Sequence, residues 1–283
     1  MIKVLKSGFF TTIQDQGRFG YGSFGVPVSG AMDTCASTFA NHILGNSMDA
    51  AVIEMTMIGA QFQFLSATLI AITGGHMNPK INNKTVPMNE VILVNKNDVL
   101  SLGNSVEGFR TYVAVKGGII TKMVLGSRSM LKEVTPSHRI NKSDHLPILE
   151  QEGIKRIKNA KVKFNSSYLN TNNIEVAKGP EFDRLSEKQK TLLLNESFKV
   201  SKYNNRMAYQ LLPVVTNTLD AILTAPVLPG TVQLTPSGQL IVLMRDCQTT
   251  GGYPRVLQLT EKAINILSQK STGNNINFTL VDY

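Results

Sequence analysis

The chain has 283 residues, of which 42% are hydrophobic and 17% are charged, and its formal net charge is +9 at pH 7. These proportions exclude an intrinsically disordered protein, and a chain of this length folds into one or two domains. The charge alone would suit a nucleic-acid-binding protein, but the dense basic cluster at residues 155–163 contains no aromatic side chain on which a base could stack. We therefore expect a solvated strand and loop there, with attraction to an acidic partner or substrate as the open alternative.

The sequence indicates neither export nor a membrane span. Residues 1–6 are too few and too charged for a signal peptide, and apolar runs such as residues 68–72 have the length of a strand. Cys35 and Cys247 form no CxxC pair, and none of the histidines has metal-ligand spacing to another ligand residue. We expect a cytoplasmic protein that binds neither nucleic acid nor a membrane and holds no metal.

The first half of the chain is predicted to consist of one helix and many strands. The helix covers residues 33–44, where apolar side chains recur on one face, Asp33 is a possible N-terminal cap and Gly45 ends the pattern. Strands are predicted at residues 52–57, 61–64, 68–72, 90–94, 99–102 and 110–115. Closely spaced strands with glycine-rich turns are typical of a barrel or a sandwich, so we expect a mainly β fold.

The least regular part of the sequence is the segment 121–173, which is rich in lysine, asparagine and serine. A strand at residues 174–176 restarts the regular pattern, so we divide the chain into residues 1–170 and residues 171–283. Helices in the second part are predicted at residues 186–195, opened by a capping box of Ser186 and Gln189, and at residues 261–267 behind the cap Thr260.

A glycine run in the first half matches the dinucleotide-binding fingerprint. It consists of Gly20, Gly22 and Gly25, but Pro27 and further helix breakers follow directly. The fingerprint needs a helix that begins at its glycines and binds pyrophosphate at its N-terminus. Because no phosphate-binding GxxxxGK[ST] run occurs either, we predict no nucleotide site in this chain.

Histidine and arginine supply candidates for substrate binding. His42 lies in the predicted first helix and is interpreted as structural, whereas His76 follows two glycines at a strand end. The chain uses 20 lysines but nine arginines, and Arg18, Arg128 and Arg206 fall in non-repetitive stretches. The planar guanidinium suits a carboxylate clamp. A structural ion pair with a buried acid is the alternative for each arginine.

The densest group of polar side chains follows a predicted buried strand at residues 240–244. Gln248, Thr249 and Thr250 directly precede a glycine pair at 251 and 252. Such glycines permit positive φ, and their successive N–H groups can form an anion nest. The functional interpretation is a pocket that hydrogen-bonds a carbonyl or oxyanion, and a tight turn between strands is the alternative.

Eight segments together carry a family resemblance. They are residues 12–18 (TIQDQGR), 25–33 (GVPVSGAMD), 51–54 (AVIE), 112–119 (YVAVKGGI), 125–129 (LGSRS), 178–180 (KGP), 229–233 (PGTVQ) and 248–254 (QTTGGYP). In order and spacing they resemble the family called carboxyltransferase domain, subdomain A and B, also called allophanate hydrolase subunit 2. Its members include KipA, the C-type component of bacterial 5-oxoprolinase and half of the carboxyltransferase domain of urea carboxylase.

The resemblance implies two cyclophilin-like β-barrel lobes and a site built from the SGAMD and QTTGGYP segments, which we predict to face one cleft. In the predicted mechanism the N–H groups of the glycine pair bind an amide oxygen, and Asp33 orients a water or proton unless its side chain is used as the helix cap. Catalytic roles are thus predicted for Asp33, Gln248, Thr249, Gly251 and Gly252. Substrate binding is predicted for Arg206, Arg128, Thr250, Tyr253 and His76.

Two departures from the family pattern leave the substrate open. Relatives usually read Ser/Asp-Asp-Arg-Met-Gly-x-Arg-Leu where this chain has residues 204–211, so Asn205 replaces an acid and Gln210 replaces a cation. His76 likewise ends a TGGH run where a TGAD-like run is more usual.

The function that the resemblance implies is that of the C-type component of an ATP-dependent 5-oxoprolinase, which hydrolyses 5-oxo-L-proline to L-glutamate. It would act with a B-type subunit (PxpB- or KipI-like) and an A-type subunit (LamB- or YcsF-like). ATP is expected to be bound by the complex and not evidently by this chain. No AMKM-like motif for covalent biotin attachment occurs.

Two alternative functions stay open. One is a KipA-like, non-enzymatic antagonist of a KipI-type inhibitor of a histidine kinase. The other is the carboxyltransferase subunit of a biotin-dependent, urea-carboxylase-like system, which the absence of fused carrier and carboxylase domains disfavours.

Overall fold

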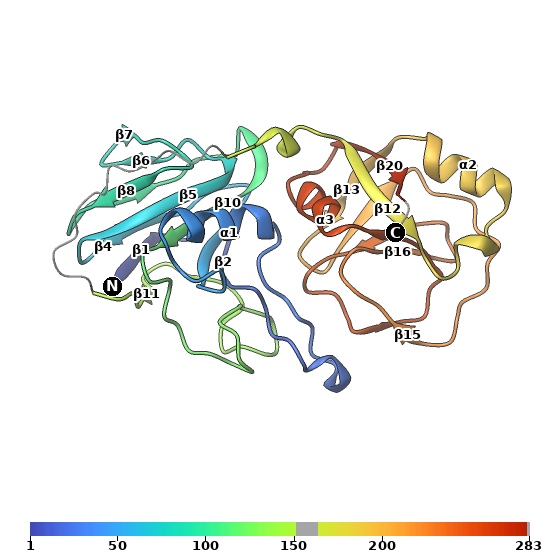
Figure 1. Ribbon diagram of the computed structural model, residues 1–283, viewed down its shortest axis with the longest axis horizontal. Coiled ribbons are helices and arrows are strands. Elements are labelled where there is room, and N and C mark those ends of the chain that lie inside the picture. Colours follow the sequence, from blue (N-terminus) through green and yellow to red (C-terminus); the bar gives the residue numbers. More distant parts are fainter. Residues whose placement is uncertain (151–163, 282–283) are drawn as a thin grey trace. The chain divides into compact units, whose positions relative to one another are not determined.

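The computed structural model describes residues 1–150 and 164–281 (Figure 1). The basic stretch 155–163 lies outside the described residues. The chain divides into two compact units, the first comprising Met1–Arg18 and Ser29–Leu169 and the second Phe19–Val28 and Asn170–Tyr283. The segment 19–28, which the predicted division assigns to the first lobe, is therefore grouped with the second unit.

Antiparallel strands form two sheets in the first unit. One sheet has the order β11 (His145–Leu146), β1 (Ile2–Lys6), β4 (Gln61–Phe64), β9 (Val99–Ser101), β6 (Lys80–Ile81), β7 (Lys84–Thr85). The other has the order β2 (Phe10–Gln14), β3 (Val52–Thr56), β10 (Glu107–Val115), β5 (Thr68–His76), β8 (Val91–Val94). The expectation of a mainly β chain is confirmed.

The core of the first unit joins its two sheets. Phe62 and Phe64 alternate with glutamines along β4, so both rings point to one face, where they join Ile53 of β3 and Val113 of β10 in one apolar cluster. Among the described strands, the edge strands β2 and β8 pair with no strand of the other sheet. The first unit therefore consists of two sheets that share one core. A β-barrel was expected for both lobes, and a barrel closed by strand hydrogen bonds is found in the second unit.

Strand β5 is longer than the sequence predicted, because its two glycines do not end it. A Cβ atom on Gly75 would lie 2.8 Å from the carbonyl oxygen of Glu107, so glycine permits the close approach of β10. The pairing of β5 with β10 shifts register between Glu107 and Thr111, and β5 continues to His76.

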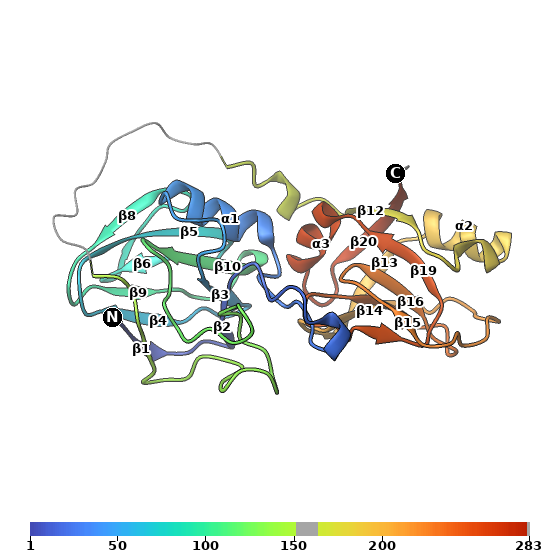
Figure 2. The same ribbon diagram turned by 60° about the horizontal axis from the view of Figure 1, so that its bottom comes forward.

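The predicted first helix is present as α1 (Thr34–Ile43), and Asp33 is its cap. The helix packs on β5 and β10, as Figure 2 shows. Its buried Ala36 and Ala40 join Ala71 and Tyr112 in a cluster separate from the core between the sheets. The helix thus covers the sheet face that points away from that core.

The second unit contains a closed seven-stranded barrel. Its order is β12 (Asn173–Lys178), β19 (Arg255–Leu259), β16 (Thr231–Leu234), β17 (Leu240–Leu243), β14 (Ala208–Leu212), β13 (Phe198–Asn204), β20 (Asn275–Leu280). Tyr209, Leu211 and Val242 are completely buried inside the barrel. Because side chains alternate along a strand, Gln210 and Ile241 point to the outer face. This outer face carries the site described below.

Two helices accompany the barrel, and both start as predicted. The helix α2 (Glu187–Asn195) has the capping box of Ser186 and Gln189, and α3 (Glu261–Ser268) is capped by Thr260. The glycine run at residues 20–25 contains only the 3₁₀ turn Gly22–Phe24, so no α-helix begins there. No helix in the described part of the chain is both long and apolar enough to span a bilayer.

Candidate functional site

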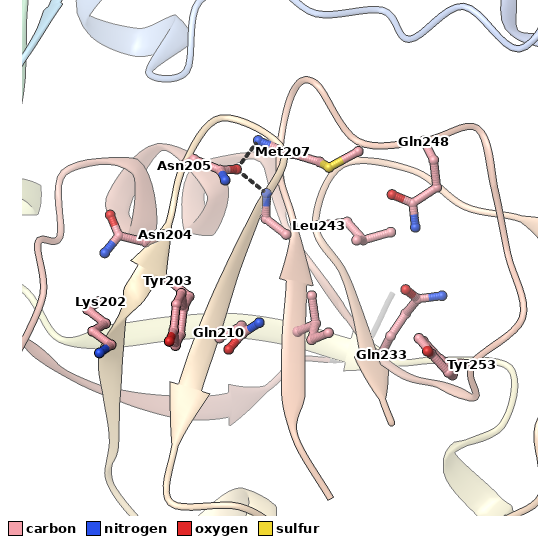
Figure 3. Close-up of a pocket in the computed structure, with 12 residues that line it drawn as sticks. Lys202, Tyr203, Asn204, Asn205, Met207, Gln210, Gln233, Leu243, Gln248 and Tyr253 are labelled. Carbon is pink, nitrogen blue, oxygen red and sulfur yellow. Dashed lines mark hydrogen bonds between the residues drawn. The ribbon is translucent and has the colours of Figure 1, made fainter. Parts of the chain in front are cut away.

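A pocket of about 500 Å³ opens on the outer face of the barrel (Figure 3). Its walls come from β13, β14, β16 and β17 and from the segment 248–253. The lining residues are Lys202, Tyr203, Asn204, Asn205, Met207, Ala208, Gln210, Gln233, Ile241, Leu243, Gln248 and Tyr253. Two of the residues predicted from the sequence, Gln248 and Tyr253, are thus brought together.

The pocket is rich in amides and poor in charge. Among the described residues that line the pocket, Lys202 carries the charge and none has a carboxylate. Ile241 and Leu243 supply apolar surface. Such a lining suits a small neutral or anionic ligand that has an apolar body and hydrogen-bond acceptors.

The segment before Gln248 is fixed by an ion pair. Arg206 is 6% exposed, and its Nε and Nη2 donate to Asp246 Oδ2 and Oδ1 at 2.8 and 2.9 Å. The backbone N–H of Asp246 also donates to the carbonyl oxygen of Arg206, at 2.9 Å. The guanidinium fork thus binds a carboxylate of its own chain, which favours the structural alternative for Arg206 and gives it a role in positioning the pocket wall.

The glycine pair does not form the predicted anion nest. Neither Gly251 nor Gly252 has a positive φ, so the left-handed geometry expected from the sequence is wrong. Instead β18 (Thr250–Gly251) pairs with β15 (Ala225–Pro226), and the carbonyl oxygens of Thr249 and Gly252 accept from Val227 and Ile222 at 3.1 and 3.0 Å. Thr249 and Thr250 flank the pocket without lining it.

A site residue that sequence reasoning missed is Gln233 on β16. It is 2% exposed, lines the pocket, and its Nε2 has no hydrogen-bond partner among the described residues. A Cβ atom on Gly251 would lie 2.4 Å from this Nε2, so glycine at 251 leaves room for the amide. The available signal was a glutamine inside an otherwise buried strand, in the PGTVQ segment.

Asp33 lies in the first unit and is completely buried. Its Oδ1 accepts from the N–H of Ala36 at 3.0 Å, and its Oδ2 accepts from Tyr168 Oη at 2.6 Å. Burial, and then the charge of Asp33, raise the pKa of Tyr168 well above its ordinary value. Tyr168 therefore stays a hydrogen-bond donor, and Asp33 is engaged as the helix cap that the sequence offered as the alternative.

The SGAMD segment is held by a buried acid of the AVIE segment, Glu54. Its Oε2 accepts from the N–H of Met32 at 2.8 Å and from Tyr112 Oη at 2.9 Å, and Arg110 Nε lies 4.0 Å from Oε1. Tyr112 Oη in turn accepts from the N–H of Asp33 at 2.8 Å. Burial, and then Glu54, raise the pKa of Tyr112. Three family segments, residues 25–33, 51–54 and 112–119, thus meet at one carboxylate.

Arg128 also lies in the first unit, where it bonds to Thr121 and Asp15. Its guanidinium donates to the carbonyl oxygen of Thr121, and its N–H donates to Asp15 Oδ2 at 2.6 Å. Asp15 Oδ1 accepts from the hydroxyls of Ser127 and Ser129, both at 2.6 Å. These contacts join the QDQGR and LGSRS segments.

His76 ends β5 in the same unit, and its Nδ1 accepts from the N–H of Asn78 at 3.3 Å. Substrate roles for Arg128 and His76, a catalytic role for Asp33, and a common cleft for the two predicted segments stay predictions.

The cysteines are free thiols with weak acidity. Burial, and then Asp246, raise the pKa of Cys247 to about 12. Burial, and then Asp33, raise the pKa of Cys35. Neither is therefore a ready thiolate nucleophile near neutral pH. Within the described residues, no group of three or more His, Cys, Asp or Glu side chains could hold a metal ion.

The fold and pocket together define a mainly β protein with a pocket on the outside of a closed barrel. The family model described as carboxyltransferase domain, subdomain A and B, matches residues 24–280. The chain belongs to this family, as its eight segments indicated.

The proteins similar to this chain include components of 5-oxoprolinases and urea amidolyases. The chain is 31% identical to the C-type component of the 5-oxoprolinase of Escherichia coli, over 98% of this chain and 90% of that protein. It is 43% identical to the urea amidolyase of Lachancea kluyveri, but over only 45% of this chain and 7% of that protein. The solved structure of the K. lactis urea amidolyase matches with a TM-score of 0.87 and 26% identity, over 99% of this chain and 19% of that chain.

Proposed function

We propose that this chain is the C-type component of a 5-oxoprolinase complex, which hydrolyses 5-oxo-L-proline to L-glutamate with ATP. The observation that carries the proposal is its similarity to the corresponding 5-oxoprolinase component of Escherichia coli over nearly the full length of both chains. Its partners would be a B-type subunit of the PxpB or KipI kind and an A-type subunit of the LamB or YcsF kind. A cytoplasmic location stays a prediction.

The pocket supports this proposal chemically. The proposed substrate is a five-membered lactam with an apolar ring, a carbonyl acceptor and one carboxylate. Apolar surface from Ile241 and Leu243 suits the ring, the amides of Gln233 and Gln248 suit the carbonyl, and Lys202 suits the anion. A lining without carboxylates avoids repulsion of the substrate's own charge.

ATP is assigned to the complex and not to this chain. The glycine run at residues 20–25 forms a 3₁₀ turn without a following helix, so it lacks the helix N-terminus that binds pyrophosphate in dinucleotide sites. We assign to this chain the binding and orientation of the lactam, and to its partner subunits the steps that need ATP.

Reconstitution tests the proposal. The chain is coexpressed with the two candidate partners, and release of phosphate and glutamate is measured with and without 5-oxoproline. We expect ATP hydrolysis that depends on 5-oxoproline. Urea is tested in parallel as the second candidate substrate, because part of the chain is similar to urea amidolyases. Tight binding to the B-type partner with no turnover on either substrate would instead support the KipA-like regulator.

A further inference from the structure

The pocket has two chemically different ends (Figure 3). Gln233, Gln248 and Tyr253 lie toward one end, and Lys202 lies toward the other, beside Tyr203. We call these the amide end (Gln233, Gln248, Tyr253) and the lysine end (Lys202, Tyr203). Because the ends differ in charge, an asymmetric ligand has a preferred direction in the pocket.

The amide end holds hydrogen-bonding groups that the protein itself leaves unused. The Nε2 of Gln233 is buried without a partner in the described part of the chain. A buried amide without a partner is unfavourable for folding, so its retention needs an explanation. Rotation about the last side-chain torsion, which is soft for glutamine, presents the NH₂ group to the pocket, next to the amide of Gln248. A ligand carbonyl oxygen would accept from these donors.

The lysine end supplies the charge that a carboxylate needs. Lys202 is the cation among the lining residues described, and its Nζ lies 5.2 Å from the centre of the Tyr203 ring. The aromatic face attracts the ammonium group and holds it near the pocket. A carboxylate placed at the amide end would instead meet only neutral donors.

We propose that the pocket binds a small lactam acid in one direction, with its carboxylate at Lys202 and its carbonyl oxygen at the Gln233 and Gln248 amides. Gly251 serves this arrangement, because a side chain there would displace the Gln233 amide. The identity of the lactam rests on the proposed function, whereas the direction of binding rests on the pocket itself.

Three probes separate the two ends. 5-Oxoproline carries both groups, 2-pyrrolidone has the carbonyl without the carboxylate, and cyclopentanecarboxylate has the carboxylate without the carbonyl. Their dissociation constants for the full chain are measured by titration followed by NMR. In the wild type, we expect 5-oxoproline to bind most tightly and to shift the side-chain NH₂ resonances of Gln233, which are assigned by their loss in Gln233→Met.

Two variants then each remove the protein group that is proposed to bind one end of the ligand. Lys202→Met should weaken binding of the two carboxylates about five- to tenfold and leave 2-pyrrolidone unchanged. Gln233→Met should weaken the binding of the two lactams, 5-oxoproline and 2-pyrrolidone, about tenfold and leave the binding of cyclopentanecarboxylate unchanged. Its melting temperature should stay equal or rise, because an unpartnered buried amide is replaced by an apolar group of similar size. Lys188→Met, at an exposed lysine on α2, is the control.

The proposal is overturned if the wild-type chain binds none of the probes, or if each variant weakens all probes equally. The experiments also distinguish a failure of this proposal from a failure of the proposed function. If the probe pattern holds but the reconstituted complex does not hydrolyse 5-oxoproline, the direction of binding stands and the function fails. If the complex hydrolyses 5-oxoproline and neither variant raises KM, the function stands and the direction of binding fails.

Discussion

At the scale of single residues, several charged groups chosen from the sequence as site candidates turn out to be engaged with their own chain. Arg206 binds Asp246 through two hydrogen bonds, and Asp33 binds the first turn of α1 and Tyr168. The Arg206–Asp246 pair holds the loop before Gln248 in place at the pocket on the barrel, whereas the contacts of Asp33 fix the start of α1 in the other unit. They also make stability the first property to measure in each variant.

Arg206→Lys should lower the melting temperature, because lysine keeps the charge but loses the bidentate geometry with the largely buried Asp246. We expect a loss of about 1–2 kcal/mol in the free energy of unfolding. Arg245→Lys, whose partner Glu261 is 59% exposed, is the control and should lose less. A raised KM for 5-oxoproline at unchanged stability would restore Arg206 as a substrate ligand.

Asp33→Asn should keep most of the stability, since asparagine caps helices about as well as aspartate. Asp33→Ala removes the cap of α1 and should cost about 1–2 kcal/mol. Thermal unfolding of both variants measures the difference. Turnover of the Asn variant in the complex then decides the catalytic prediction, because asparagine cannot act as a base. Full turnover would leave Asp33 with a structural role alone.

At the scale of elements, the segment that follows β12 is fastened to β19 by an ion pair. Glu181 binds the Arg255 side chain at 3.0 and 2.9 Å and also accepts from its N–H at 2.8 Å. The Arg255 hydrogen bond is the main cause that lowers the pKa of Glu181. The contact between the segment after β12 and strand β19 therefore contributes to stability in a pH-dependent way.

The sign of that contribution follows from the lowered pKa. The stabilisation is fully present above the unfolded-state pKa of about 4.3 and is lost as the pH falls through the lower folded-state pKa. Glu181→Gln should therefore be less stable than the wild type by about 1–2 kcal/mol near neutral pH, and the difference should shrink toward pH 3. Denaturant titrations from pH 3 to 7 measure it. A difference independent of pH would contradict this account.

The pairing of β15 with β18 places Gly251 against the Gln233 amide, whereas Gly252 has space. A Cβ atom at 252 would meet only the Ile222 carbonyl oxygen, at 3.6 Å. Gly251→Ala should thus cost about 1 kcal/mol and Gly252→Ala little. Adding Gln233→Ala to Gly251→Ala should recover part of the loss, as a double-mutant cycle of unfolding free energies will show. Purely additive losses would mean that the two side chains do not meet.

At the scale of the whole molecule, the proposed reaction needs partner subunits for its nucleotide, because the glycine run at residues 20–25 opens no α-helix and no GxxxxGK[ST] run occurs in the sequence. We therefore expect the purified chain alone to show no ATP hydrolysis and no glutamate release, and to gain both only with its B-type and A-type partners. Coupled assays of the single chain, of each pair and of the full set measure this. Turnover by the single chain would require a catalytic site that the proposal lacks.

The sequence by itself determined the family, the mainly β character and the helix caps. These depend on local patterns, such as the alternation along β4 and the polar caps Asp33, Ser186 and Thr260, which a neighbourhood of a few residues defines. The QTTGGYP segment was also recognised as part of a site, and its Gln248 and Tyr253 do line the pocket.

Only the tertiary structure decided which polar groups are left for a ligand. Arg206 and Gln233 look equally available in the sequence, but Asp246, 40 positions away from Arg206, binds the guanidinium, whereas no described residue accepts from the Gln233 amide. The role of Gly251 also depends on a distant residue, because this glycine makes room for the Gln233 side chain of another strand and does not form a left-handed turn. Long-range pairing sets both outcomes, and no local pattern records which partners the barrel will bring together.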